Sequence, residues 1–413
     1  MTIAPGLPTE ADAVVVGAGA FGLGAAYQLA RLGAGRVLVL DAREPGTQSS
    51  GRAAGLFKSV QADEPLTRLA ALSREIVLGL AAVEGVDNPV VRSGSVLAAR
   101  TEAHAALIRR EVDAVGAWGI ETEWLDASAV RRLAPYLVGT GLRAAVHVPT
   151  DCFIEEPITL LAALVVAVAN RGGTVRGDTP VTRLLTDDGR VAGVETPDGV
   201  VRTERVVDAA GAWVKGVAGT AGVRVPTATF RHQLAITRPI AGIAGSEPIT
   251  RLIDASAYCR PCRGGLMFGG FEQNPLPFDP VAAGPDFSMD DVPLDLSVVG
   301  GFAAGLAGQV PAIPDMPLAE HRGGVFTMTP DSRFLVGPIG GVEGLWVASG
   351  CNGSGYSMAP GLGLLLAERM LDGDPTLDPA PWDPGRFGTS LTEEDLVATG
   401  AHQYANYYTP TDV

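Results

Sequence analysis

The hydrophobic pattern at the start of the chain predicts a strand, a helix and a second strand. Residues 13–16 form a continuous apolar run, which is typical of a strand buried on both faces. Small and apolar residues then recur at helical spacing over 24–32, and Gly33 and Gly35 follow as helix terminators. A second strand is predicted at 36–41, where four apolar residues are followed by an acid. A strand, a helix and a strand within about thirty residues form the unit that builds a parallel sheet.

Further along the chain, the same reading predicts more helices and one long β region. The β region breaks at Asp188-Gly189 and Asp198-Gly199, dipeptides that favour tight hairpin turns. Helices are predicted at 66–83, 102–116, 157–170 and 364–371, strands within 133–148 and 174–207, and a buried strand at 345–350.

Composition and charge narrow the class of protein. The chain has 413 residues, of which 46% are hydrophobic and 19% charged, as in globular proteins. Its net charge of −15 repels phosphate backbones, so we expect no nucleic-acid partner. Residues 1–5 lack the regions of a signal peptide, and the apolar run at 158–169 is too short to cross a bilayer. We therefore expect a cytoplasmic protein with no membrane partner.

The cysteines predict neither a disulfide framework nor a metal site. Cys259 and Cys262 form a Cys-x-x-Cys motif, but a zinc site needs a second ligand pair, and Cys152 and Cys351 are single. A redox pair needs a thioredoxin-like context, which the sequence lacks. Packing is therefore the favoured role of the pair, and we expect no metal.

The loop Gly17-Ala18-Gly19-Ala20-Phe21-Gly22 follows the first predicted strand and indicates a dinucleotide site. The first glycine makes the turn, the second lets the backbone approach a pyrophosphate, and the third lets helix and strand pack closely. The helix N-terminus offers free N–H groups to the phosphates. Asp41, at the end of the second strand, can accept hydrogen bonds from ribose hydroxyls. This pattern alone does not separate NAD from FAD.

Four later segments distinguish FAD from NAD, because they resemble segments of a known family: 49–55, 207–213, 329–331 and 350–363. Together they resemble the D-amino acid oxidase-like superfamily of FAD enzymes, which includes glycine oxidase, sarcosine oxidase and dimethylglycine dehydrogenase. The resemblance implies FAD and an α/β fold, with a Rossmann-like FAD-binding domain plus a substrate domain built on a large mixed β-sheet. It implies an FAD-binding domain at 10–85, 150–225 and 322–382, a substrate-binding domain at 86–149 and 226–321, and a C-terminal tail at 383–413.

The resemblance also assigns candidate cofactor-binding residues. The segment 353–363 is expected to wrap the isoalloxazine end, and the helix after it to point its N-terminus at the flavin pyrimidine, where the dipole favours negative charge. The candidates are Gly17, Gly19, Phe21, Gly22, Asp41, Ala42, Ser50, Arg52, Ala53, Ala54, Ala210, Gly211, Trp213, Gly353, Ser354, Gly355, Tyr356 and Ser357.

Two further motifs, 231–233 and 269–272, resemble the dimethylglycine and sarcosine dehydrogenase branch. In that branch a His at the position of His232 and a Tyr at that of Tyr258 lie near the substrate amine. Both are therefore candidate catalytic residues, able to hold or accept an amine proton. The alternative is that His232 satisfies a buried hydrogen bond and that Tyr258 packs in the sheet.

Departures from the family pattern carry their own predictions. Arg52 and Gly324 stand where relatives with covalent flavin have His or Cys, so we predict non-covalent FAD. Ser357 stands where monomeric sarcosine oxidases have a carboxylate-binding Lys, and Met267 where they have an oxygen-reactive Lys. The candidate substrate-binding residues are Lys58, Arg260, Cys351 and Ser357, the first two as partners of a carboxylate.

The resemblance implies oxidation of the C–N bond of a secondary or tertiary amine or (N-methyl) amino acid. Hydride transfer to flavin N5 would give an imine that hydrolyses. The expected partner is a small-molecule amine or amino acid, and the electron acceptor stays open. Three alternatives stay open as well: an NAD-linked dehydrogenase, an FAD-dependent 2-hydroxy acid dehydrogenase, and a non-catalytic binding protein on an FAD fold.

Overall fold

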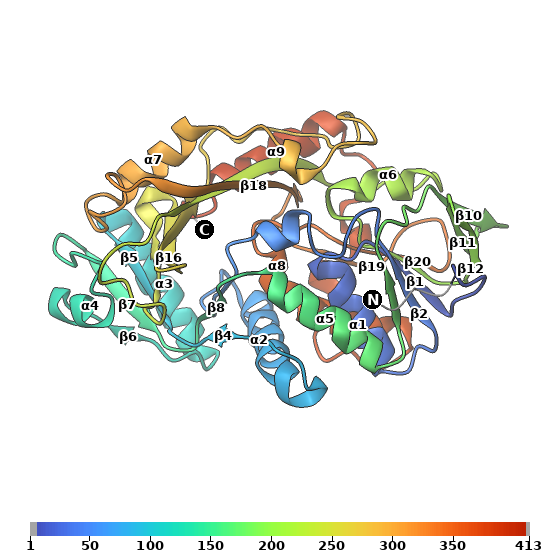
Figure 1. The fold of residues 1–413 in the computed structure, drawn as a ribbon, viewed down its shortest axis with the longest axis horizontal. Helices are drawn as coiled ribbons and strands as arrows, with labels where there is room; N and C mark the ends of the chain where they lie inside the picture. Colours follow the sequence, from blue (N-terminus) through green and yellow to red (C-terminus); the bar gives the residue numbers. More distant parts are fainter. Residues whose placement is uncertain (1–5, 410–413) are drawn as a thin grey trace.

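The computed structural model describes residues 6–409 and contains two large β-sheets with helices packed on them (Figure 1). Strands β1, β2 and β20 lie at the right of Figure 1, and β5, β7 and β16 at the left. The predictions for residues 1–5, and for the last residues of the expected tail at 410–413, lie outside the described residues.

The first sheet has six strands in the order β19-β20-β13-β1-β2-β9. All neighbours pair in parallel except β19 and β20. Every residue of β1 and β2 is buried, which explains their continuous apolar runs. The strands are β1 Ala13–Val16, β2 Val37–Leu40, β9 Thr174–Arg176, β13 Val206–Asp208, β19 Leu335–Pro338 and β20 Leu345–Ser349. With α1 (Ala20–Arg31) between β1 and β2, the predicted strand–helix–strand unit is confirmed.

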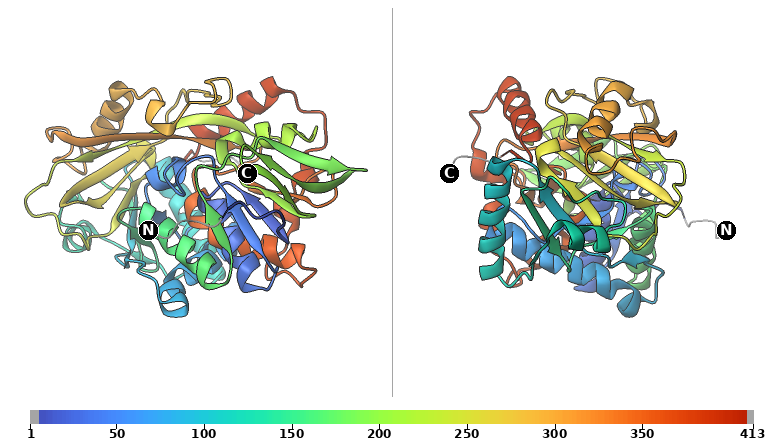
Figure 2. Two further views of the ribbon diagram at one scale, coloured as in Figure 1. Left: turned by 45° about the vertical axis from the view of Figure 1, so that its right-hand side comes forward. Right: turned by 90° about the vertical axis from the view of Figure 1, so that its left-hand side faces the viewer.

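Helices cover one face of this sheet and a small antiparallel sheet covers the other. On the first face α1, α5 and α8 share one hydrophobic cluster with alternate residues of β1 and β2, and α2 packs against α8. On the second face the remaining residues meet β10–β12 and α6 (Figure 2). These elements are α2 Glu64–Glu84, α5 Ile158–Asn170, α6 Val214–Gly219, α8 Gly355–Met370, β10 Arg183–Asp187, β11 Arg190–Thr196 and β12 Gly199–Arg202.

The second sheet has eight strands in the order β18-β14-β17-β16-β15-β5-β7-β6. It is mixed, because β15 and β5 pair in parallel while the other neighbours are antiparallel. The α/β fold with a large mixed sheet is therefore confirmed. The strands are β5 Ser95–Ala99, β6 Glu123–Trp124, β7 Ala144–Val148, β14 Ala228–Thr237, β15 Ile249–Leu252, β16 Ala257–Cys262, β17 Gly265–Gly270 and β18 Leu318–Met328.

Helices α4 and α7 cover one face of the eight-stranded sheet, and α3 covers part of the other at β5 and β7. A short sheet β3-β8-β4 lies beside α2 and α5. Near the C-terminus, α9 packs against β14 and β18. The bounds are α3 Glu102–Ala117, α4 Ala127–Leu133, α7 Leu296–Leu306, α9 Glu393–Ala405, β3 Leu56–Phe57, β4 Val90–Val91 and β8 Cys152–Ile154, with 3-10 turns η1 Ser49–Arg52, η2 Gly211–Trp213, η3 Ile253–Ala255, η4 Met289–Asp291, η5 Ala380–Trp382 and η6 Pro384–Phe387.

Two sequence-based expectations are corrected. The segment 133–148, expected to be rich in strands, holds a single strand, the five-residue β7, preceded by the end of α4. The helix expected at 364–371 begins nearer the glycine cluster, at Gly355. A Cβ atom on Gly363 would lie 2.4 Å from the backbone of Gly24 in α1, so this glycine serves close helix packing. The domain boundaries stay predictions, and β18 crosses the one placed at 322.

Candidate functional site

A cavity of about 840 Å³ extends from the carboxyl ends of β1 and β2 to the eight-stranded sheet. It brings together nearly all the candidate residues, with Gly22 and Arg260 as the exceptions. The candidates that line it are Gly17, Gly19, Phe21, Asp41, Ala42, Ser50, Arg52, Ala53, Ala54, Lys58, Ala210, Gly211, Trp213, His232, Tyr258, Cys351, Gly353, Ser354, Gly355, Tyr356 and Ser357.

Glycine serves a different purpose at each of the three positions in the loop. Gly17 has φ +100°, and a Cβ atom there would lie 2.5 Å from the carbonyl oxygen of Ala209. A Cβ atom on Gly22 would lie 1.8 Å from the carbonyl oxygen of Gly17, so Gly22 closes the turn and does not reach the cavity. Gly19 has an ordinary φ of −81°, and its nearest obstacle is the Ser50 hydroxyl at 3.0 Å. The bare backbone at Gly19 therefore leaves room for a ligand, which fits a pyrophosphate at the N-terminus of α1.

Asp41 lies at the end of β2 and closes the same end of the cavity. Its Oδ2 accepts the Ala18 amide at 2.6 Å and its Oδ1 accepts the Arg43 amide at 2.8 Å. Burial raises the pKa of Asp41, and these two amide bonds offset part of that rise. The carboxylate is thus fixed by backbone, and its other lone pairs remain for ribose hydroxyls.

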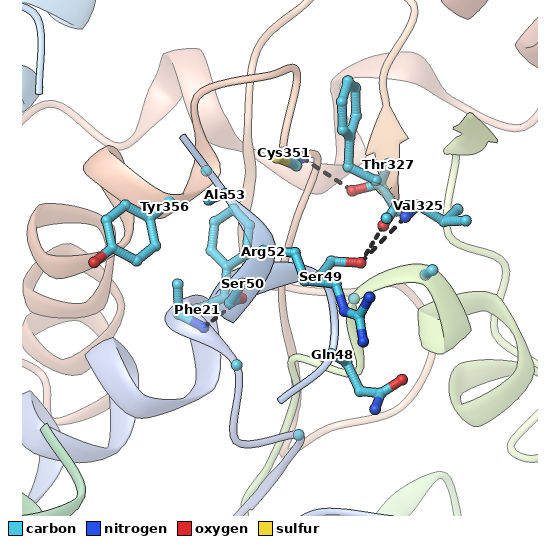
Figure 3. Close-up of a pocket in the computed structure, with 18 of the residues that line it drawn as sticks. Phe21, Gln48, Ser49, Ser50, Arg52, Ala53, Val325, Thr327, Cys351 and Tyr356 are labelled. Atoms are coloured by element: carbon cyan, nitrogen blue, oxygen red, sulfur yellow. Dashed lines mark hydrogen bonds between the residues drawn. The ribbon is translucent and has the colours of Figure 1, made fainter. Parts of the chain in front are cut away.

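The turn η1 is bonded to α1 on one side and to β18 of the eight-stranded sheet on the other (Figure 3). Ser50 Oγ accepts the Ala20 amide at 3.0 Å, in the first turn of α1. Ser49 Oγ donates to the Val325 carbonyl of β18 at 2.6 Å. The segment is therefore held from both sides, as a wall for a planar ring system requires.

The N-terminus of α8 lies at the end of the cavity where the family resemblance places the flavin ring. The Cys351 amide donates to Thr327 Oγ1 at 2.9 Å, which fixes the turn before the helix (Figure 3). Residues 353–357 line the cavity, so the first turn of α8 points its free N–H groups at it. Gly361 and Gly363 pack against α2 and α1 instead, so only the first part of 353–363 can wrap a ring. Burial raises the pKa of the Cys351 thiol, which keeps it neutral at pH 7.

His232 projects from β14 into the other end of the cavity. Its Nδ1 lies 2.8 Å from the Tyr404 hydroxyl and its Nε2 lies 3.3 Å from the Tyr258 hydroxyl. The rings of Phe271 and Phe326 stand 5.4 and 5.2 Å from the imidazole. Burial lowers the pKa of His232 to about 4, so the imidazole is neutral at pH 7. A neutral imidazole can accept one proton from a substrate amine.

Tyr258 on β16 reaches His232 on β14 although β17 lies between these strands. Gly269 on β17 makes this possible. In the sheet, Gly269 lies between Tyr258 on β16 and Leu234 on β14. A Cβ atom on Gly269 would lie 2.6 Å from the Tyr258 hydroxyl and 2.9 Å from Leu234 Cβ. The tyrosine side chain therefore lies across the bare backbone. The glycine pair at 269–270 was the sequence signal for this arrangement, but its use was not predicted.

Three tyrosines after residue 400 complete the site, and sequence reasoning missed them. Tyr404 contacts His232, and Tyr407 and Tyr408 line the cavity. The Tyr407 ring stacks on Phe271 at 3.8 Å, and its hydroxyl contacts Lys58 Nζ and lies 2.9 Å from Ser354 Oγ. Nothing in the local sequence signals this role, because it arises when α9 packs against β14 and β18.

Arg260, a predicted carboxylate partner, is placed away from the cavity. It is fully buried, and its guanidinium donates to the carbonyls of Ala54 and Glu155 at 2.8 Å. Arg251, one strand away on β15, lines the cavity instead and was missed by the sequence analysis. Met267 is also buried outside the cavity wall.

The remaining cysteines and charged groups add no second site of the kinds considered from sequence. Cys259 and Cys262 are buried free thiols that belong to different hydrophobic clusters. Among residues 6–409, no group of three or more His, Cys, Asp or Glu side chains could hold a metal ion. In the same part of the chain, no helix is both long and apolar enough to cross a bilayer.

Comparison with known proteins gives the family. Residues 12–369 match the DAO family, described as FAD dependent oxidoreductases. The chain is 32% identical to 4-methylaminobutanoate oxidase (formaldehyde-forming) of Paenarthrobacter nicotinovorans, over 92% of this chain and 46% of that protein. It is 30% identical to mitochondrial sarcosine dehydrogenase of Homo sapiens, over 97% of this chain and 44% of that protein. The chain thus spans about half the length of these curated relatives.

A solved structure shares the fold over most of both chains. The crystal structure of L-proline dehydrogenase from P. horikoshii superposes with a TM-score of 0.83 at 25% identity, covering 92% of this chain and 98% of that one. The family match confirms the predicted resemblance and the predicted FAD, and the cavity is lined by the glycine loop, Asp41 and the N-terminus of α8. The chain belongs to the DAO family of FAD-dependent oxidoreductases.

Proposed function

We propose that this chain oxidises the C–N bond of an N-alkylated amino acid or amine. The observation that carries the proposal is the neutral His232, which faces the cavity from a shell of aromatic rings. Aromatic faces attract an alkylammonium group, and a neutral imidazole can take a proton from it. The relatives named for sarcosine and for 4-methylaminobutanoate support the same substrate class.

In this mechanism the residues bind the amine, remove its proton and exclude water. Bound FAD supplies the acceptor for the hydride that leaves the α-carbon. His232 Nε2 accepts the amine proton when Tyr404 holds the other nitrogen in its protonated form. Tyr258 lies beside Nε2 and orients the amine by its hydroxyl. The stacked rings of Phe271 and Tyr407 shield this end of the cavity from solvent.

We further propose that FAD is held non-covalently. Arg52 is engaged with Asp290 at 2.5 Å, Gly324 has no side chain, and the half-buried Cys351 thiol is neutral at pH 7. None of the three offers a nucleophile to the flavin ring. Precipitation of the purified protein with acid should therefore release all the flavin into the supernatant. Flavin fluorescence that stays with the denatured chain on a gel would show a covalent bond.

Anaerobic reduction of the bound flavin tests the substrate class. We expect N-methyl amino acids to bleach the flavin, and 2-hydroxy acids to leave it oxidised. The panel should also contain D-amino acids and simple amines. Bleaching by hydroxy acids alone would refute the proposal, and no bleaching at all would favour a binding protein. A colourless preparation that reacts with NAD would favour an NAD-linked enzyme. Mixing the reduced protein with aerated buffer then measures whether oxygen accepts the electrons.

A further inference from the structure

We propose that Arg251 binds the carboxylate of the substrate, so that the preferred substrate is an amino acid and not a simple amine. This inference rests on the proposed oxidation of a C–N bond at His232. It concerns a residue on the wall of the same cavity, one strand away from Tyr258.

The sheet places Arg251 beside the proposed amine site. Arg251 on β15 stands directly opposite Tyr258 on β16 in the antiparallel register. Side chains of directly opposed residues lie on the same face of a sheet, with Cβ atoms about 5 Å apart. Both residues line the cavity, and the Tyr258 hydroxyl reaches His232. An α-amino acid could therefore place its amine near His232 and its carboxylate near Arg251.

The guanidinium of Arg251 is buried but incompletely paired. The residue is 4% exposed, and among residues 6–409 its Nε has no hydrogen-bond partner. Its Nη2 reaches Asp151 Oδ2 only at 3.5 Å. Asp151 is already engaged, because its carboxylate accepts the Ser59 amide and the Ser95 hydroxyl, both at 2.6 Å. A buried guanidinium whose N–H groups lack acceptors destabilises the folded protein. A carboxylate that accepts two of these N–H groups would supply the missing acceptors.

A second acid lies near this guanidinium without pairing with it. Burial raises the pKa of Glu111 on α3, and the charges of Arg251 and then Lys58 oppose that rise. The burial that raises this pKa disfavours the charged carboxylate, and in the described part of the chain Glu111 forms no ion pair with Arg251. Glu111 therefore takes up none of the N–H donors of this guanidinium.

Two other cations of the cavity wall, Lys58 and Arg322, have partners of their own. Lys58 Nζ bonds the Tyr407 hydroxyl and lies 4.3 Å from the centre of that ring. Arg322 Nη1 has no hydrogen-bond partner among the described residues, but its Nε and Nη2 bond both oxygens of Glu320 at 2.6 and 3.0 Å. Its charge is therefore balanced by a close, bidentate carboxylate. Of these three cations, Arg251 has the geometry that leaves the most N–H donors for a substrate.

The test compares N-methylglycine with its carboxamide as anaerobic reductants of the FAD-loaded protein. The wild type should prefer the carboxylate, and Arg251→Gln should lower that preference by about 100-fold, because truncating one partner of a buried charge pair has effects of this size. Arg322→Gln is the matched control and should keep the preference, as should Lys58→Met. Arg251→Lys should keep part of it, since charge remains without the bidentate fork.

Calorimetry with acetate, which cannot be oxidised, gives a second readout that does not depend on turnover. Acetate should bind the wild type and Arg322→Gln, but not Arg251→Gln. A wild type without preference for the carboxylate, or an Arg251→Gln variant that keeps it, would overturn the proposal. If Arg251→Gln does not fold, weaker acetate binding by Arg251→Lys than by the wild type supports the proposal, and unchanged binding contradicts it. If neither reductant bleaches the flavin, the proposed function fails, while acetate binding still tests Arg251.

Discussion

The Gly19→Val variant is expected to fold but to bind FAD much more weakly, so that it is purified without most of its flavin. Gly19 has an ordinary φ of −81°, which valine can adopt, and the loop itself presents only the Ser50 hydroxyl at 3.0 Å. The valine methyl groups would instead fill the space before the N-terminus of α1. Overpacking costs roughly 1–3 kcal/mol, and each lost hydrogen bond to a charged phosphate about 1.5–3 kcal/mol. We therefore expect the FAD affinity to fall by about 100-fold or more.

Visible flavin absorbance and far-UV circular dichroism of the purified variant check this prediction. Gly22→Val is the contrasting variant, because its Cβ atom would lie 1.8 Å from the Gly17 carbonyl oxygen, which no relaxation of a side chain relieves. It should give unfolded or insoluble protein. A Gly19→Val protein that keeps its flavin would show that the pyrophosphate does not approach this backbone.

The contrast between these glycines shows what the sequence could predict. The loop, the first helix and Asp41 lie within one contiguous segment, where the spacing of apolar residues and glycines reflects local geometry. The late glycine cluster is harder to interpret, because glycine ordinarily breaks helices. In this fold Gly363 lies inside α8, where close contact with α1 replaces the missing side chain.

The catalytic end of the cavity depends on contacts that no local pattern contains. Tyr404 reaches His232 only because α9 packs over β14, across 172 positions of sequence. The choice between Arg260 and Arg251 likewise depends on which stretch of each strand lies over the cavity. Alternation along a strand identifies the face on which a side chain lies, but not the part of that face that remains uncovered.

His232→Ala is expected to slow flavin reduction by about 10²- to 10⁴-fold, the usual contribution of a positioned general base. FAD content should stay unchanged, because His232 lies at the opposite end of the cavity from the glycine loop. Burial holds the pKa of His232 at about 4, so wild-type reduction at saturating substrate should show no inflection near pH 6.5. Below about pH 4 the imidazole is protonated and cannot accept the amine proton, so the rate should fall there. Stopped-flow absorbance under anaerobic conditions measures both effects.

Variants around His232 separate a proton acceptor from a packing residue. Tyr404→Phe removes the hydroxyl bonded to Nδ1, and it should slow reduction and shift its pH profile, since the tautomer is no longer fixed. Gly269→Ala should displace Tyr258, whose hydroxyl would lie 2.6 Å from the new Cβ atom. Its effect on the rate should match that of Tyr258→Phe, and the double variant should be no slower, because both changes remove the same contact. If His232→Ala instead loses FAD and melts at lower temperature, while retaining the reduction rate in its remaining holoprotein, the imidazole is structural and the proton must leave the substrate before it binds.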